Sequence, residues 1–210
     1  MVTINGEKMS KSLGNIRSIK RVLEDWGPNI MRLFCISGHY SKPIDYSEEL
    51  LKENLTKWRQ AEICFYEMVH ASGQAGGGNI KKTIQKCARE FDSALECDFN
   101  THLALSAFFM LVKEINRVAA EDGLGSVDAE IAGKEFARMS QVLGLNLPKV
   151  TSTQKSEVDT LVSERERLRR EKHFEDADKI RDKLSEMNID TIDHKGKTVW
   201  IKKEKIKADM

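Results

Sequence analysis

The sequence has little or none of several features that mark other classes of protein. It has three prolines and four cysteines in 210 residues, and no apolar run approaches the roughly 18 residues of a membrane helix. Its first residues lack the apolar segment of a secretory signal, and no two cysteines form a CxxC pair. We therefore expect a cytoplasmic protein with reduced thiols and no membrane partner, rather than a disulfide scaffold or a zinc ribbon.

A large net charge is also missing. The 34 Lys and Arg residues nearly balance the 33 Asp and Glu residues, which gives a formal charge of +1 at pH 7. Any nucleic-acid binding must therefore depend on basic residues that are grouped locally. The chain is instead rich in charged residues of both signs (32%), with apolar positions at helical spacing, and this predicts a mainly α-helical fold.

Helical patterns fill the first two thirds of the chain. Two short helices are predicted between Ser18 and Gly38, because Gly27 can end the first and Pro28 fits the first turn of the second. Residues 47–144 then predict a bundle of four antiparallel helices. Several aromatic side chains of this bundle are expected in its core, namely Trp58, Phe65, Phe99, Phe108 and Phe109.

Dense alternating charge marks the last third of the chain. Sparse but periodic apolar residues predict two helices that break near His173. Two short β-prone runs around Lys195 and Gly196 then predict a hairpin. The fold class is therefore mainly α, ending in a small α+β unit.

The stretch "GEKMSKSLGN", from Gly6 to Asn15, has the composition of a phosphate-binding loop. Lysines can neutralise phosphate oxygens, while glycines and serines let backbone amides approach them. On composition alone, such a loop is more often simply solvated.

The string "KMSKS" within it resembles the second signature of class I aminoacyl-tRNA synthetases. The stretches "RLFCISGHYSKPIDYSEELL", "DFNTHLALSAFFMLVKEINR" and "RLRREKHFEDADKIRDKLSEMNI" follow it, and together the four resemble the cysteinyl-tRNA synthetase family over nearly the whole chain. The resemblance implies an enzyme that activates cysteine with Mg-bound ATP and transfers it to tRNA(Cys). The residues over the ATP phosphates would be Lys8, Met9, Ser10, Lys11 and Ser12, with Lys11 and Lys8 as the catalytic cations.

Two features that the resemblance implies are missing from this sequence. The resemblance implies a His-Ile-Gly-His-type signature and a zinc site that recognises the substrate thiol, and neither is found in the sequence. We expect this chain to be the C-terminal part of the enzyme, with no metal site of its own. Cysteine would be bound by an N-terminal domain, so that the chain alone is inactive.

The resemblance also implies three regions. Residues 1–46 would be the loop and a stem-contact region at the tail of the catalytic domain. Residues 47–147 would contact the anticodon stem, and residues 154–210 would bind the anticodon. Arg32 keeps a basic position in a partial match to a family motif, although a solvated helix residue explains it equally well. His39 and Tyr40 are expected to be structural first and acceptor-arm contacts second.

Anticodon recognition needs flat faces for bases and cations for phosphates. Trp200, followed by Lys202 and Lys203, fits this need, although Trp200 is equally well explained as the core of a small domain. Asp193 or Asp190 could accept a hydrogen bond from a base edge. Basic residues of the preceding helices could reach the RNA or pair with acidic neighbours, namely Arg165, Arg169, Arg170 and Arg181.

Three other functions fit parts of the sequence. The first is a free-standing, non-catalytic tRNA-binding module. The second is a ligase that joins cysteine to a small amine, which would not need the segment from Ala177 to Lys203. The third is a charge-rich helical scaffold without an RNA partner. We expect a monomer that binds tRNA(Cys) and ATP.

Overall fold

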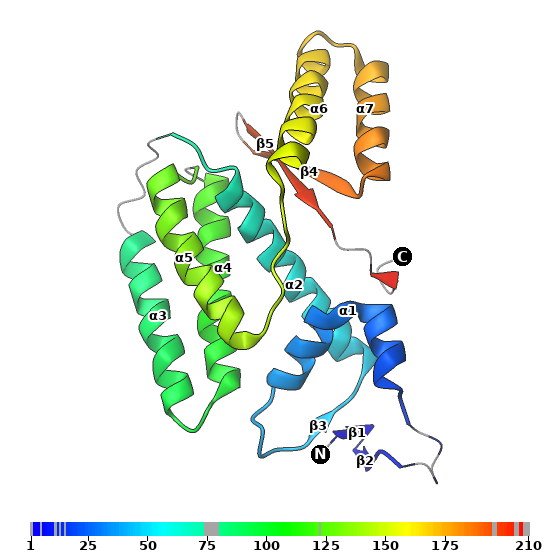
Figure 1. Cartoon of the computed structure of the whole chain (residues 1–210), viewed down its shortest axis with the longest axis vertical. Helices are drawn as coiled ribbons and strands as arrows, with labels where there is room; N and C mark the ends of the chain where they lie inside the picture. Colours follow the sequence, from blue (N-terminus) through cyan, green and yellow to red (C-terminus); the bar gives the residue numbers. More distant parts are fainter. Residues whose placement is uncertain are drawn as a thin grey trace. The chain divides into compact units, whose positions relative to one another are not determined.

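The computed structural model describes residues 2–4, 6–10, 12, 14, 16–73, 80–121, 123–194, 197–203 and 206–207. Seven helices dominate these residues, so the predicted mainly α fold is confirmed (Figure 1). The chain divides into two compact units, residues 1–147 with 206–210 and residues 148–205. No helix in the described part of the chain is both long and apolar enough to cross a bilayer.

Helix α1, Ile19–Ile36, contains the break that the sequence predicts. Gly27 has φ +79° and ψ 168°, which is not helical, and Pro28 begins the next segment. Ser18 precedes the helix, but its side chain makes no capping hydrogen bond. The helix buries Trp26, Ile30 and other apolar residues against the first unit.

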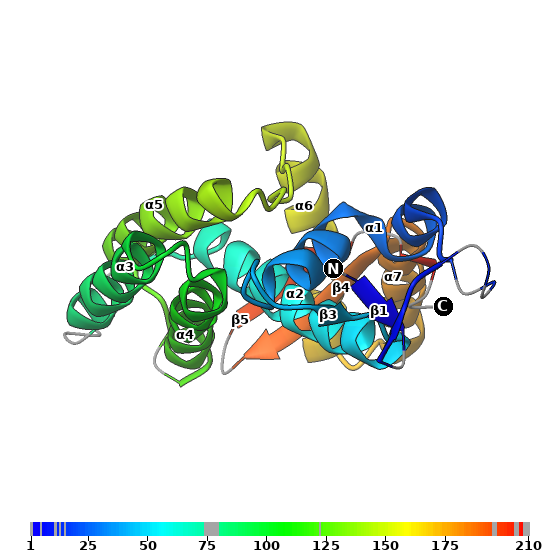
Figure 2. The ribbon, with the colours of Figure 1, turned by 90° about the horizontal axis from the view of Figure 1, so that it is seen from below.

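A small sheet at the start of the chain was not predicted. Its strands are β1 (Val2–Ile4), β2 (Glu7–Lys8) and β3 (Ile44–Asp45), in the order β2-β1-β3. All three are labelled in Figure 1, and Figure 2 shows β1 and β3 from below. Strand β1 is antiparallel to β2 and parallel to β3. Strands of two or three residues are too short to show an alternating pattern, so the sequence carries no periodic signal for them.

The four bundle helices are α2 (Glu48–Val69), α3 (Ile80–Glu96), α4 (Thr101–Glu121) and α5 (Ser126–Leu143). The Leu50 N–H donates to Ser47 Oγ at 3.1 Å, and the Leu103 N–H donates to Asn100 Oδ1 at 3.1 Å. Serine and asparagine caps of this kind satisfy the first free amides of a helix. They explain why α2 and α4 begin where they do.

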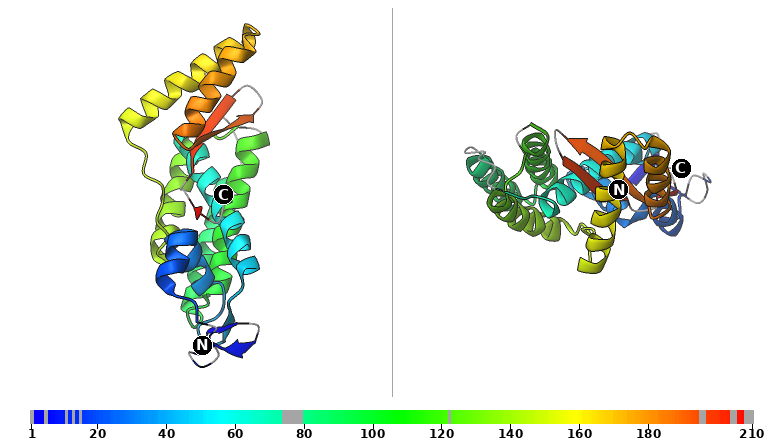
Figure 3. Two further views of the ribbon diagram at one scale, coloured as in Figure 1. Left: turned by 90° about the vertical axis from the view of Figure 1, so that its right-hand side faces the viewer. Right: turned by 90° about the horizontal axis from the view of Figure 1, so that it is seen from above.

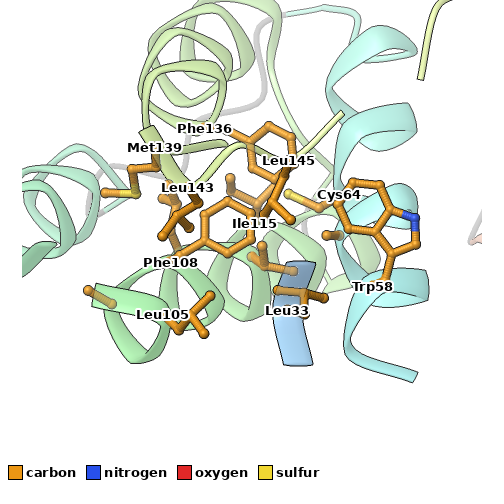
Figure 4. Close-up of a cluster of buried hydrophobic side chains, with 14 of the residues drawn as sticks. Leu33, Trp58, Cys64, Leu105, Phe108, Ile115, Phe136, Met139, Leu143 and Leu145 are labelled. Carbon is orange, nitrogen blue, oxygen red and sulfur yellow. The ribbon is translucent and has the colours of Figure 1, made fainter. Parts of the chain in front are cut away.

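The bundle core is shown in Figure 4, where Leu33 of α1 points toward Trp58 of α2 and the rings of α4 and α5. Phe108 stacks on Phe136 with ring centroids 5.3 Å apart. Trp58 and Phe108 are fully buried, as predicted, and Phe65 and Phe109 pack against the core while partly buried.

Phe99 corrects one prediction. Its side chain is 71% exposed rather than packed in the core. Asp98 and Phe99 both have positive φ, 54° and 48°, as the chain turns from α3 into α4. This left-handed turn directs the ring away from the helix interface, which a helical pattern could not reveal.

The second unit consists of α6 (Ser152–Arg170), α7 (Phe174–Glu186), β4 (Ile189–His194) and β5 (Lys197–Lys202) (Figure 3). The helix break and the hairpin are where the sequence predicts them. The strands pair antiparallel, with Thr191 opposite Trp200 and Asp193 opposite Thr198. The unit has a small core of its own, made of Val158, Val162, Ala177, Leu184, Ile189, Val199, Trp200 and Ile201.

The end of α5 provides a test of the fold. Gly144 has φ +70°, and a Cβ added there would lie 3.2 Å from the Arg32 guanidinium carbon. We expect Gly144→Ala to lower the free energy of unfolding by about 1 kcal/mol, because alanine is strained in the left-handed region. Gly133→Ala, inside α5, is the control and should be neutral or stabilising. Urea denaturation measures both, and equal effects would contradict the assigned cap.

Candidate functional site

The lysine- and serine-rich loop leaves the end of β2. Lys8 and Ser12 are exposed, while Met9 and Ser10 are half-buried. The hydroxyls of Ser10 and Ser12 lie 3.2 Å apart. Lys11, the first choice for the catalytic lysine, lies outside the described residues. The loop therefore presents hydroxyls and an ammonium group where a phosphate could approach.

The base of this loop is tied to β3 through Asp45. Asp45 Oδ1 accepts from the Thr3 hydroxyl at 2.6 Å and from the Gly6 N–H at 3.0 Å. The Tyr46 N–H donates to the Thr3 carbonyl at 2.7 Å. Ser47, which caps α2, follows directly after Tyr46. The hydrogen bonds of Asp45 and Tyr46 therefore connect the start of the loop to the first turn of α2.

His39 and Tyr40 join the segment after α1 to the α3–α4 turn. The Tyr40 hydroxyl donates to Asp98 Oδ1 at 2.6 Å, and the His39 ring stacks on the Tyr40 ring at 4.6 Å. The hydrogen bond to Asp98, with smaller effects of desolvation and charge, raises the pKa of Tyr40. These contacts support the structural role that was expected first for both residues.

Arg32 lies beside the C-terminal end of α5. Its guanidinium group borders Gly144, and the side chain is exposed. A cation in this place is favoured by the partial negative charge at a helix C-terminus. Arg32 therefore has a structural partner in the chain.

In the second unit, Asp193 is surrounded by donors. Its carboxylate accepts from Thr198 Oγ1 at 2.8 Å and from Arg169 Nη1 at 3.0 Å, and Arg165 Nη1 lies 3.8 Å away. Partial burial raises the pKa of Asp193, but the hydrogen bonds from Thr198 and Arg169 and the charge of Arg165 outweigh this and leave the pKa below its usual value. Arg169 and Asp193 remain about half exposed (49% each).

Trp200 corrects another prediction. Its side chain is 2% exposed, and its indole N–H donates to Asp159 Oδ1 at 2.6 Å. The ring has no face open to a base, so Trp200 is one of the core residues of the small unit. The alternative that the sequence left open is the one that the structure supports.

The remaining basic candidates lie on the surface of this unit. Lys202 and Lys203 are exposed, and Lys203 forms an ion pair with Asp190. Arg181 is exposed on α7 and forms no ion pair with the described residues. Asp190 and Asp193 thus both have basic partners within the unit.

Phe174 is an exposed aromatic residue that was not among the predicted site residues. It is the first residue of α7 and is 60% exposed. Lys172, with φ +64°, and His173 immediately precede it. Phe174 fits the periodic apolar pattern of this part of the sequence, yet its position after "RLRREKH" was a signal for an exposed aromatic residue among cations.

The contacts of Asp193 give a prediction with a pH dependence. Asp193→Asn should lower the free energy of unfolding by about 1–2 kcal/mol at neutral pH, because Arg165 stays buried without its counter-ion. The loss is no larger because the carboxylate of Asp193 is half exposed, and solvent screens its charge. The folded-state pKa is depressed, so this stabilisation is present above the unfolded pKa of about 3.9 and is lost as the pH falls through the lower folded pKa. Thermal melts should therefore converge in acid, and a difference that persists there would contradict the assignment.

A metal site is not part of this arrangement. In the part of the chain that the structure describes, no three side chains of His, Cys, Asp or Glu converge to hold an ion. These residues therefore do not form a site for the zinc ion that the resemblance implies.

Comparison with known proteins assigns these features to a class. Residues 1–56 match the model of the class I (C) tRNA synthetase catalytic domain, and residues 90–148 match that of the DALR domain. The chain thus contains parts of a class I aminoacyl-tRNA synthetase.

Individual relatives identify the family. Cysteine–tRNA ligase of Geobacter sp. (strain M21) is 36% identical over 220 residues, covering 95% of this chain and 45% of the relative. The ligase of Pseudomonas aeruginosa (strain LESB58) is 34% identical over 206 residues, covering 95% and 43%. The chain belongs to the cysteinyl-tRNA synthetase family and spans less than half the length of these relatives.

Proposed function

We propose that this chain supplies the ATP-phosphate loop and the tRNA-binding half of an enzyme that loads cysteine on tRNA(Cys). The observation that carries the proposal is the match of 95% of the chain to cysteine–tRNA ligases, with Lys8 to Ser12 reading KMSKS. The full reaction needs a pocket for cysteine and for the adenosine of ATP. In our proposal, the N-terminal part of the enzyme provides both, and residues 1–46 are the tail of its catalytic domain.

The loop acts on the triphosphate. The cysteine carboxylate attacks the α-phosphorus of Mg-bound ATP, the bond to the β-phosphate oxygen breaks, and pyrophosphate leaves with the electron pair. Negative charge therefore grows on the departing phosphates, where the ammonium groups of Lys8 and Lys11 would stabilise it. Ser10 and Ser12 would hydrogen-bond phosphate oxygens, and half-buried Met9 would anchor the loop. The contacts of Asp45 with Thr3 and Gly6 support a fixed base for this loop.

The two remaining regions would bind RNA. We assign residues 47–147 to the anticodon stem and residues 154–210 to the anticodon loop. Exposed Phe174 offers the aromatic face, with Arg169 and Lys172 close in sequence and Arg181 on the same helix. Asp193 and Arg169 offer an acceptor and a donor for base edges at a half-exposed position. Arg32, Lys202 and Lys203 would contact phosphates, and the enzyme would work as a cytoplasmic monomer.

The RNA surface is tested by exposed residues whose loss should not unfold the chain. Phe174→Ala and Arg169→Gln should each weaken binding of tRNA(Cys) by about tenfold, because base stacking and charged hydrogen bonds contribute about 1–3 kcal/mol each. Fluorescence anisotropy with labelled tRNA(Cys) measures the affinity, and circular dichroism verifies the fold.

Phe99→Ala is the matched control, since Phe99 is exposed to a similar degree on the first unit. It should leave the affinity unchanged. Equal losses from Phe174→Ala and Phe99→Ala, or none from either, would argue against an anticodon surface at the start of α7.

A further inference from the structure

A pocket of about 580 Å³ lies between α2 and α4 in the first unit, and no step proposed above uses it. Four apolar side chains line it, Leu50 from α2 and Leu105, Phe109 and Val112 from α4. This volume is typical of pockets that bind a small molecule. The pocket is therefore large enough for a flat ring held between apolar walls.

Two amide side chains in the lining each have one buried atom without a hydrogen-bond partner among the described residues. Asn54 is 2% exposed, and its Nδ2 finds no acceptor among the described residues. Asn116 donates through Nδ2 to the Gln60 carbonyl at 3.0 Å, while its buried Oδ1 accepts from no described group. An unsatisfied buried polar atom costs about 1–3 kcal/mol. One missing acceptor and one missing donor together match the edge of a nucleobase, which presents both.

The lining also carries positive charge without a counter-ion. Lys57 of α2 and Lys113 of α4 are exposed, and neither forms an ion pair with a residue that the structure describes. Their helix neighbours behave differently, since Arg59 pairs with Glu62 and Arg117 with Glu114. Two lysines left unpaired on facing helices favour an anionic group on the ligand.

We propose that this pocket binds one nucleotide. The base would lie between Phe109 and the aliphatic side chains, its edge would meet Asn54 and Asn116, and its phosphate would meet Lys57 and Lys113. The same chemistry is offered by a free nucleotide and by one residue of an RNA strand. The inference does not depend on the loop at Lys8–Ser12 or on the second unit.

Titration of the ¹⁵N-labelled chain with AMP, GMP, CMP and UMP, without magnesium, tests the proposal. We expect the side-chain amide signals of Asn54 and Asn116 to shift for at least one of them or for a short single-stranded oligoribonucleotide. The double variant Lys57→Gln/Lys113→Gln should weaken binding about tenfold, because each exposed lysine contributes a charge interaction that solvent partly screens. Lys52→Gln, on the same helix but outside the pocket, is the control and should bind as the wild type does.

The outcomes separate the sources and the sites. Binding of a monophosphate identifies a free nucleotide, and binding of the oligonucleotide alone identifies an RNA residue. Binding should persist in Lys8→Gln/Lys11→Gln. If it is lost there and kept in Lys57→Gln/Lys113→Gln, the pocket proposal is wrong while the loop proposal stands. Unchanged Asn54 and Asn116 signals with every probe would also overturn it.

Discussion

Trp200→Ala should unfold the second unit or leave it barely stable. The ring is 2% exposed in a core of only a few apolar residues, and removing a buried tryptophan costs about 3–5 kcal/mol. It also leaves Asp159 without the indole N–H that donates to it. Urea unfolding, followed by hydrogen exchange of the amides in residues 148–205, should show protection lost there.

Trp200→Phe is the matched control for this change. It keeps an aromatic ring in the core and removes the hydrogen bond to Asp159, so the loss should be about 1–2 kcal/mol. Helix amides of the first unit should keep their protection in both variants. If Trp200→Ala retains full stability and instead loses only tRNA affinity, the ring is a binding platform and its burial has been misassigned.

Lys11→Ala and Lys8→Ala should each lower ATP-dependent activation of cysteine by about 10²–10³-fold, when the chain is joined to the N-terminal half of the Geobacter relative. Removing one group that stabilises developing charge has an effect of this size. Cysteine-dependent exchange of pyrophosphate into ATP measures the step. The loss should fall mainly on kcat, because the charge appears in the transition state.

Lys20→Ala is the control for the loop lysines. Lys20 is exposed on α1 and has no ion pair among the residues described, so its removal should leave exchange unchanged. Lysines that only attract ATP from solution would raise KM in all three variants alike. That pattern would contradict a role for Lys8 and Lys11 in the chemical step.

The helices of this protein could be predicted because local signals agree with tertiary packing. Ser47 and Asn100 cap α2 and α4 through their own side chains, and Gly27 ends the first segment of α1 with a positive φ. Such signals lie within a few residues of the structure that they specify. The hairpin of β4 and β5 belongs to the same group, since the sequence between two β-prone runs contains Lys195 and Gly196, which predict a short connection.

The orientation of the aromatic residues could not be predicted in the same way. Val199, Trp200 and Ile201 are all buried, so both faces of β5 are covered and alternation does not separate inside from outside. The lysines after Trp200 suggested an exposed ring, but packing within the unit decides its position. Phe99 and Phe174 show the reverse case, because each lies where the chain turns at a helix boundary: Asp98 and Phe99 have positive φ, and so does Lys172, two residues before Phe174.

The geometry of the candidate site could not be predicted from the sequence. Arg169 and Asp193 are 24 residues apart in sequence, and only the fold brings them into a hydrogen bond. The tie between Asp45 and Gly6 spans 39 residues and depends on a sheet with no sequence signal. Contacts of this kind depend on tertiary structure, which one sequence does not reveal.

Binding of tRNA(Cys) by the purified chain is the most direct test of the account. We predict association at low ionic strength, an affinity that falls at least about tenfold between about 50 and about 200 mM salt, and a further loss when the anticodon bases are replaced. No association at low salt, or equal affinity for the native and the altered anticodon, would contradict the assignment of this chain as the tRNA-binding half of the enzyme.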